Sequence, residues 1–314
     1  MYKKNTKNEK SLTPEQSKRR RFWRDNIINT AMAFPPFLGF LLFWVTPMIA
    51  ALLISFTELH SYNFSMAKFV GLRNYVEIWK SNMLWTSIRN TLFFCLSVPI
   101  NLILVLFLSN LLDRKVKGYK IWRAILFIPK VCSGVAVTLA WQWIFEENYG
   151  VINSFLEALN IAKMPFFSNP AYFRPAVLII GIWMSGTNVV LLDAAFANID
   201  RTLVEAARID GANEMQVFWK IKFPALTPTL FYCLTMNLIG ALQEQSLMQV
   251  ITTNGVGPGN AAVTLVYYIY RMAFVYTPTM GFGMACALSW VTAMFIALIT
   301  RLNFILSKKW VHYD

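Results

Sequence analysis

The chain has 314 residues, of which 56% are hydrophobic and only 14% are charged. A soluble domain carries about 25% charged residues, so this composition argues against a water-exposed globular protein and indicates a membrane protein. The net charge of +13 gathers at the ends of apolar runs and forms no basic stripe with interleaved aromatic residues, which argues against nucleic-acid binding.

The first 30 residues are predicted to be a disordered basic tail, because nine Lys and Arg residues fall within the first 24 positions. An uncharged apolar run follows at residues 31–56. It is longer than the 7–15 residues of a signal-peptide core, and about 20 apolar residues suffice to cross a membrane. We therefore expect a retained first membrane span.

Five further apolar runs follow along the chain. Together they predict an all-α integral membrane protein with six transmembrane helices. The third run contains Pro129 and Lys130, the fourth Asp193 and the fifth Glu244. The expected spans are residues 31–56, 91–112, 122–145, 176–197, 225–251 and 280–306, which form a transmembrane domain at 31–306 with a short C-terminal tail at 307–314.

The orientation follows from the positions of Lys and Arg, which favour cytoplasmic segments. With the N-terminus inside, the inner segments carry 21 of these residues and the outer segments seven. Both termini are therefore expected in the cytoplasm, together with the segment at residues 199–224.

That segment is predicted to be a helix, a turn and a second helix. Leu203 to Ala212 favours a helix, and Gly211 stands where a helix ends and turns. The segment contains four acidic and four basic residues, whereas a helix resting on anionic lipid would be biased towards Lys and Arg. A surface with both signs and the small pair Ala206-Ala207 suits docking into a protein groove, although an ordinary interfacial linker is the simpler alternative.

The same segment resembles the EAA loop of binding-protein-dependent ABC importer permeases. The matching positions are Glu205, Ala206, Ala207, Gly211, Ile221, Phe223 and Pro224. Phe223 stands where the family usually has leucine, and Ile209-Asp210-Gly211-Ala212 is similar to the carbohydrate-uptake subfamily. Weaker similarities to that subfamily occur at residues 69–75, 141–143, 150–153 and 262–274.

The resemblance implies a type I ABC importer permease fold in a bacterial cytoplasmic membrane. It also implies four kinds of partner: the lipid bilayer, a second homologous permease, two copies of a cytoplasmic ATPase and an extracytoplasmic solute-binding protein. The coupling helix that contacts the ATPase would use Glu205, Ala206, Ala207, Asp210 and Gly211. The chain contains no G-x-x-x-x-G-K-[ST] motif, so we expect no enzymatic activity and no cofactor in this chain, with ATP and Mg bound by the partner ATPase.

Polar residues within spans are costly in lipid and mark candidate positions in a solute pathway. In the fifth span Asn237, Ala241, Glu244 and Met248 fall on one helix face, beside Gln245. Trp183, Met184, Thr187 and Asn188 form a comparable patch in the fourth span. Hydrogen bonding between helices is the alternative role for these residues, and a structural or gating role is expected for Asp193.

The substrate expected from the resemblance is a di- or oligosaccharide. Glycerol 3-phosphate is an alternative, but a phosphate favours Arg or Lys and the fourth and fifth spans contain neither. An ion-driven secondary transporter would need no EAA loop. Neither the two histidines nor the four dispersed cysteines form a cluster that could hold a metal, and no nucleophile–base pair indicates a membrane enzyme.

Overall fold

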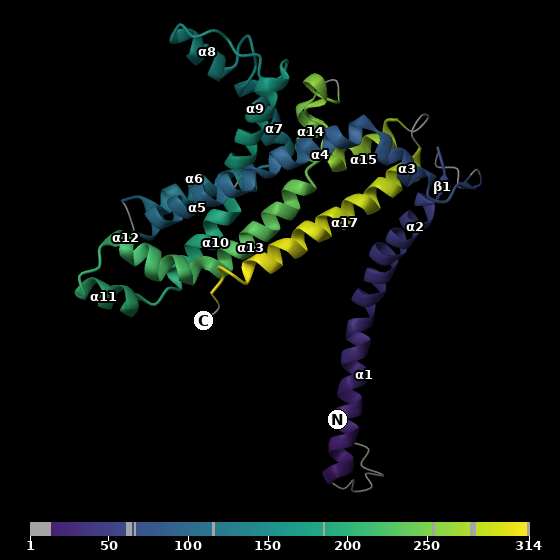
Figure 1. Cartoon of the computed structure of the whole chain (residues 1–314). Coiled ribbons are helices and arrows are strands. Elements are labelled where there is room, and N and C mark those ends of the chain that lie inside the picture. The colour runs from purple at the N-terminus through teal and green to yellow at the C-terminus, as the bar shows by residue number, and fades with distance from the viewer. Residues whose placement is uncertain are drawn as a thin grey trace, which may run out of the picture. The chain divides into compact units, whose positions relative to one another are not determined.

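The computed structural model describes residues 14–60, 65, 67–114, 117–184, 186–252, 255–276 and 281–312. The chain divides into two units, Met1–Ile54 and Ser55–Asp314, and each is considered by itself. Figure 1 shows that helices make up nearly all of the described chain. This confirms the all-α class.

The described part of the first unit, from Pro14 onwards, is a single helical run. It comprises α1 (Pro14–Phe40), a π-helical turn (Leu41–Val45) and α2 (Thr46–Ser55). The Thr46 hydroxyl donates to the Leu41 carbonyl at 2.9 Å, and the next residue, Pro47, has no N–H to continue the α-helical ladder. Widening of one turn accommodates both features.

The expected disordered tail at residues 1–30 is wrong for residues 14–30, which are helical. Neither Gly nor Pro interrupts residues 15–34, and the Lys, Arg, Glu and Gln residues in this stretch are good helix formers. The helix of the first span therefore continues into the basic segment. Residues 1–13 lie outside the described part of the chain.

The second unit opens with a short antiparallel hairpin, β1 (Thr57–Glu58) and β2 (Lys68–Phe69). Helices follow through the rest of the described residues. In chain order they are α3 (Arg73–Lys80), α4 (Asn82–Cys95), α5 (Ser97–Asp113), α6 (Tyr119–Val131), α7 (Gly134–Ile144), α8 (Val151–Ala158), α9 (Pro170–Trp183), α10 (Gly186–Ala197), α11 (Arg201–Ile209), α12 (Glu214–Val217), α13 (Phe223–Leu242) and α14 (Ser246–Ile251). They are followed by α15 (Leu265–Phe274) and α17 (Phe282–Ser307) after a 3₁₀ turn at Pro258–Asn260.

Four helical runs in the described residues are long and apolar enough to cross a membrane: Asp25–Ser55, Asn82–Asp113, Glu214–Leu242 and Phe282–Ser307. Two bent pairs, α6 with α7 and α9 with α10, bring the number to six if each pair counts as one span. The predicted number of spans thus agrees with the upper value. Met280, the expected start of the sixth span, lies outside the described residues.

The third expected span is not one straight helix. The axes of α6 and α7 differ by 102°. Pro129 within α6 lacks a backbone N–H, and Gly134 begins α7, so a proline and a glycine flank the break. This local chemistry turns the chain sharply where the apolar pattern continues.

The fifth expected span, 225–251, is also too long, because α13 ends at Leu242 and residues 243–245 leave the helix. The turn is held by polar bonds: the Thr264 hydroxyl donates to the Glu244 carbonyl at 2.7 Å, and the Leu247 N–H donates to the Glu244 carboxylate at 2.9 Å. The second span begins at Asn82, nine residues before the expected position, since α4 continues the helix through polar residues.

Helix α10 packs against α5, α6 and α13 in the second unit (Figure 1). One apolar cluster, with Leu192, Leu226 and Leu230, surrounds this packing. Another cluster joins α4, α9 and α14 through Phe94, Ile180 and Met248. The two clusters fix the helices that border the cavity described below.

Gly186 provides a test of this packing. A Cβ atom at Gly186 would lie 2.5 Å from the Leu126 carbonyl oxygen of α6, so Gly186→Ala is expected to destabilise the protein by about 1–3 kcal/mol through overpacking. The matched control is Gly240→Ala in α13, where no atom lies within 4 Å of the added Cβ, and which should be neutral or stabilising by up to ~1 kcal/mol. Thermal unfolding in detergent compares them; equal melting temperatures would contradict the close α6–α10 approach.

Candidate functional site: a central cavity and an exposed helical loop

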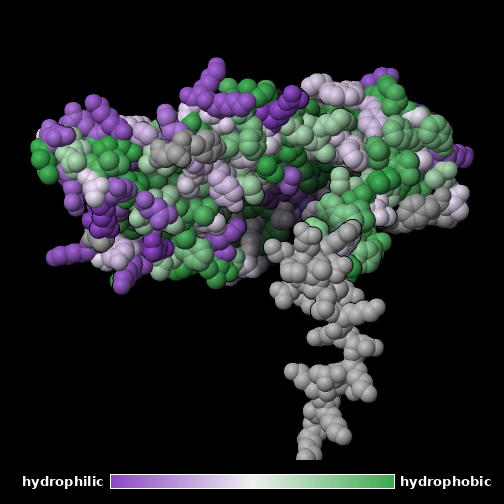
Figure 2. Space-filling model, turned by 90° about the horizontal axis from the view of Figure 1, so that it is seen from below, coloured by the Kyte–Doolittle hydropathy of each residue, from purple (hydrophilic) through white to green (hydrophobic). Residues whose placement is uncertain are grey.

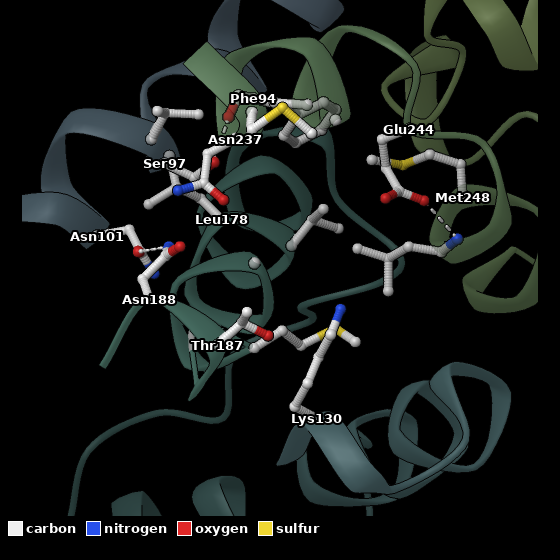
Figure 3. Close-up of a pocket in the computed structure, with 18 residues that line it drawn as sticks. Phe94, Ser97, Asn101, Lys130, Leu178, Thr187, Asn188, Asn237, Glu244 and Met248 are labelled. Atoms are coloured by element: carbon white, nitrogen blue, oxygen red, sulfur yellow. Dashed lines mark hydrogen bonds between the residues drawn. The ribbon is translucent and has the colours of Figure 1, made fainter. Parts of the chain in front are cut away.

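A cavity of about 380 Å³ lies between the helices of the second unit, within the size range of small-ligand sites. Residues from α4, α5, α6, α9, α10, α13 and α14 border it (Figure 3). The lining is Phe94, Ser97, Val98, Asn101, Lys130, Val177, Leu178, Gly181, Met184, Thr187, Asn188, Met236, Asn237, Gly240, Ala241, Glu244, Leu247 and Met248.

Three asparagines form one wall of the cavity, which we call the amide wall (Asn101, Asn188 and Asn237). Asn188 donates to the side-chain oxygen of Asn101 at 3.1 Å, and Asn101 donates to the Ile182 carbonyl at 2.9 Å. The side-chain nitrogen of Asn237 is buried and has no hydrogen-bond partner among the described residues. Since an unpaired buried donor is costly, Asn237 is ready to donate to a solute oxygen.

Glu244 lies across the cavity from the amide wall, next to Met248 (Figure 3). The prediction that Asn237, Ala241, Glu244 and Met248 share one helix face is wrong, because α13 ends at Leu242. The turn at 243–245 nevertheless directs Glu244 and Met248 to the same cavity as Asn237 and Ala241. The four residues therefore line one cavity, although a turn and not a continuous helix brings them together.

Six of the eight predicted pathway residues line the cavity. They are Met184, Thr187, Asn188, Asn237, Ala241 and Glu244. Trp183 does not line it; its ring lies edge-on to Trp141, with centroids 5.6 Å apart. Gln245 does not line it either, and its amide donates to Gln249 at 2.9 Å. Each is the sequence neighbour of a lining residue and points in a different direction.

The sequence prediction missed the contribution of α5 and α6, which supply Ser97, Asn101 and Lys130. Two signals were present, since Asn101 and Lys130 are polar residues inside expected spans. Lys130 also bears on anionic solutes. The fourth and fifth spans contain no Lys or Arg, but the third span supplies this cation to the cavity.

The second feature is the loop formed by α11 and α12. The Asp200 carboxylate accepts a hydrogen bond from the Thr202 N–H at 2.9 Å at the start of α11, and this bond lowers the pKa of Asp200. At the end of α11, Gly211 has a φ of +84°. The Ala212 N–H donates to Ala207 and the Gly211 N–H donates to Arg208, which is the bonding of a Schellman turn.

The second helix starts with a reciprocal cap. Asn213 accepts from the Gln216 N–H at 2.9 Å, and Gln216 accepts from the Asn213 N–H at 2.8 Å. Helix α12 then continues through a π-helical turn (Phe218–Lys222) into α13. The predicted helix, turn and second helix are therefore present, and the second helix is continuous with the span that borders the cavity.

The outer face of this loop is exposed. Glu205, Ala206, Asp210 and Gly211 are exposed and Ala207 is partly buried. Ile209 is 86% exposed, an unfavourable position for a large apolar side chain at a polar end of the molecule. Figure 2 shows hydrophilic residues gathered at the end of the second unit that carries α11 and α12.

Ion pairs occur within the loop, between the loop and the spans, and between two of the spans. Lys222 lies 2.5 Å from the Asp113 carboxylate at the end of α5, with side chains only 10% and 23% exposed. Arg208 pairs with Glu214 at 2.7 Å across the turn. Asp193 of α10 pairs with Arg123 of α6, in keeping with a structural role.

Among the described residues, no group of three or more His, Cys, Asp or Glu could hold a metal ion.

Several candidate membrane spans, a polar cavity between helices and an exposed helical loop together form the architecture of a membrane permease. Residues 15–312 match the family described as "Binding-protein-dependent transport system inner membrane component". The chain belongs to this family, and it is therefore a multi-pass permease component of the inner membrane, distinct from the ATPase of such systems.

Two curated relatives cover nearly the whole chain. The "Probable ABC transporter permease protein YesP" of Bacillus subtilis (strain 168) is 34% identical, over 95% of this chain and 96% of that protein. The "Arabinooligosaccharides transport system permease protein AraP" of the same organism is 32% identical, over 90% and 91%.

The fold is similar to a solved structure. A chain of the "bacterial ABC transporter involved in the import of the acidic polysaccharide alginate" matches with a TM-score of 0.77 over 92% of this chain and 99% of that chain, at 23% identity. This similarity establishes the type of permease fold.

Proposed function

We propose that this chain forms half of the translocation pathway of an ATP-driven importer for a di- or oligosaccharide. The main support for this function is the cavity, whose amide wall and Glu244 offer donors and acceptors for sugar hydroxyls. The relative that transports arabinooligosaccharides supports a carbohydrate. In this function Asn237 donates to a sugar oxygen, and Asn188, Thr187 and Glu244 border the same solute.

The coupling to ATP passes through the α11–α12 loop. Glu205, Ala206, Ala207, Asp210 and Gly211 form the contact with a cytoplasmic ATPase, with the alanines allowing close approach. Residues Glu214–Leu242 run as one 29-residue helix from this loop to the cavity, about 43 Å at ~1.5 Å per residue. Movement of the loop therefore tilts the helix that carries Asn237 and Ala241.

The assembly consists of this chain, a second homologous permease, two ATPase subunits and an extracytoplasmic solute-binding protein. The ATPase subunits bind ATP and Mg. The solute-binding protein delivers the sugar to the outer face, and the second permease closes the pathway opposite this chain.

Two other functions make different predictions. A permease for another solute of the same subfamily, such as glycerol 3-phosphate, would need ATP but reject neutral sugars. An ion-driven secondary transporter would transport solute without any ATPase and would need no exposed α11–α12 loop.

The test is sugar uptake into proteoliposomes that contain the whole complex, with loaded binding protein outside and ATP inside. Wild-type uptake should require ATP, and Asn237→Leu should lower it about tenfold or more, because a sugar hydroxyl left unpaired in a closed cavity costs ~1–3 kcal/mol. Gln245→Leu is the control, since Gln245 does not line the cavity. Uptake that persists without the ATPase, driven by an ion gradient, would refute the proposal.

A further inference from the structure

Among the described residues that line the cavity, Lys130 is the only Lys or Arg. It lies eleven residues into α6 from Tyr119, about 16 Å along the helix axis at ~1.5 Å per residue. Its side chain is exposed, and Figure 3 shows its amino group directed into the space between the amide wall and Glu244. A cation at such a depth usually faces a water-filled pathway or a partner charge.

In the described part of the chain no carboxylate lies within 4.0 Å of the Lys130 amino group. Glu244 supplies the one carboxylate among the described residues that line the cavity, and it accepts the Leu247 N–H at 2.9 Å. Within the spans, Asp193 has such a partner in Arg123. Lys130 therefore has no ion-pair partner among the described residues.

We propose that Lys130 binds an anionic group of the solute and makes the cavity selective for acidic saccharides. The inference rests on the proposed function, since it names the class of sugar that occupies the same cavity. The hydroxyls of such a sugar face the amide wall, and its carboxylate faces Lys130. A uronic acid carries both kinds of group on one sugar ring.

A carboxylate fits this cavity better than a phosphate ester. Lysine acts as a single point charge, and the cavity holds one cation together with the Glu244 carboxylate. Each carboxylate group carries one negative charge to match this one cation, whereas a phosphate dianion carries two on a single group and would favour a second cation or an arginine fork.

The test measures direct binding to the complex in nanodiscs by saturation-transfer NMR, without binding protein or nucleotide, so that delivery does not affect selectivity. Three solutes are compared: the α-1,4 disaccharide of galacturonic acid, the matching disaccharide of galactose, and glycerol 3-phosphate. The two disaccharides differ only in carrying a carboxylate or a hydroxymethyl group on each ring. The wild type should bind the acidic disaccharide about tenfold more tightly than the neutral one, the usual scale of one charge-assisted contact.

Lys130→Gln should abolish this preference, and Lys130→Arg should retain it. Lys120→Gln is the matched control, because Lys120 lies on the same helix but does not line the cavity. Equal binding of both disaccharides by the wild type, or a preference that survives in Lys130→Gln, would overturn the inference while leaving the pathway role standing. Tighter binding of glycerol 3-phosphate than of the acidic disaccharide would overturn the inference, because the preferred anion would then be a phosphate. Binding of none of the three solutes would contradict both this inference and the proposed function.

Discussion

Lys222→Met is expected to lower the free energy of unfolding by about 3 kcal/mol, because it leaves a poorly exposed carboxylate without its cation. Lys222 and Asp113 lie 2.5 Å apart, and Lys222 also lies over the ring of Phe196 at 5.9 Å. Methionine preserves most of the side-chain volume, so the loss reports the charge and not a cavity.

Lys220→Met is the matched control for this substitution. Lys220 belongs to the same π-helical turn but is exposed, so its removal should change stability by less than about 0.5 kcal/mol. The double variant Asp113→Asn with Lys222→Met should recover much of the loss, because neither charge is then left unpaired. Thermal unfolding of the complex in nanodiscs measures all four proteins, and equal effects of the two lysine substitutions would contradict a structural ion pair.

Gly211→Ala is expected to reduce ATP-coupled uptake by about tenfold, equivalent to ~1.4 kcal/mol of lost docking energy. At a φ of +84°, any side chain with a Cβ is strained, by about 1–2 kcal/mol. The strain is intrinsic to the backbone, since no atom lies within 4 Å of the position that the added methyl group would occupy. The Schellman turn is therefore expected to open, and the orientation of α11 relative to α12 to change.

Gly71→Ala separates this effect from a general loss of stability. Gly71 also has positive φ, +59°, and open space around it. It precedes α3, at the opposite end of the second unit from α11 (Figure 1). The two substitutions should cost similar stability, but only Gly211→Ala should uncouple ATP hydrolysis from uptake. Similar ATP-coupled uptake by both variants would show that the turn at Gly211 is not needed for coupling.

The sequence predicts features that depend on local chemistry well. The sequence places a glycine, Gly211, where the helix should end, which predicts a left-handed backbone conformation there. The structure confirms a positive φ at Gly211. The apolar runs predict the spans because burial in lipid requires about 20 such residues. Helix α17, Phe282–Ser307, lies within two residues of the predicted span.

The sequence does not predict where helices stop inside an apolar run. Apolar residues continue on both sides of the break between α6 and α7. The turn after Leu242 is held by Thr264, which is 20 residues away from Glu244. Long-range bonds of this kind leave no periodic signal. The sequence marks Asn101 and Lys130 as polar residues within expected spans, but it does not show that α5 and α6 border the cavity, because that depends on how the helices pack.

The central claim is that this permease transmits ATP hydrolysis to its cavity through Glu205 and the α11–α12 loop. The most direct measurement is the ATPase activity of the complete complex in nanodiscs, with and without the sugar-loaded binding protein, for the wild type and for Glu205→Lys. The loaded binding protein should stimulate the wild type, whereas Glu205→Lys, assembled in normal yield, should show no stimulation. Equal stimulation of both proteins would show that Glu205 does not couple ATP hydrolysis to transport.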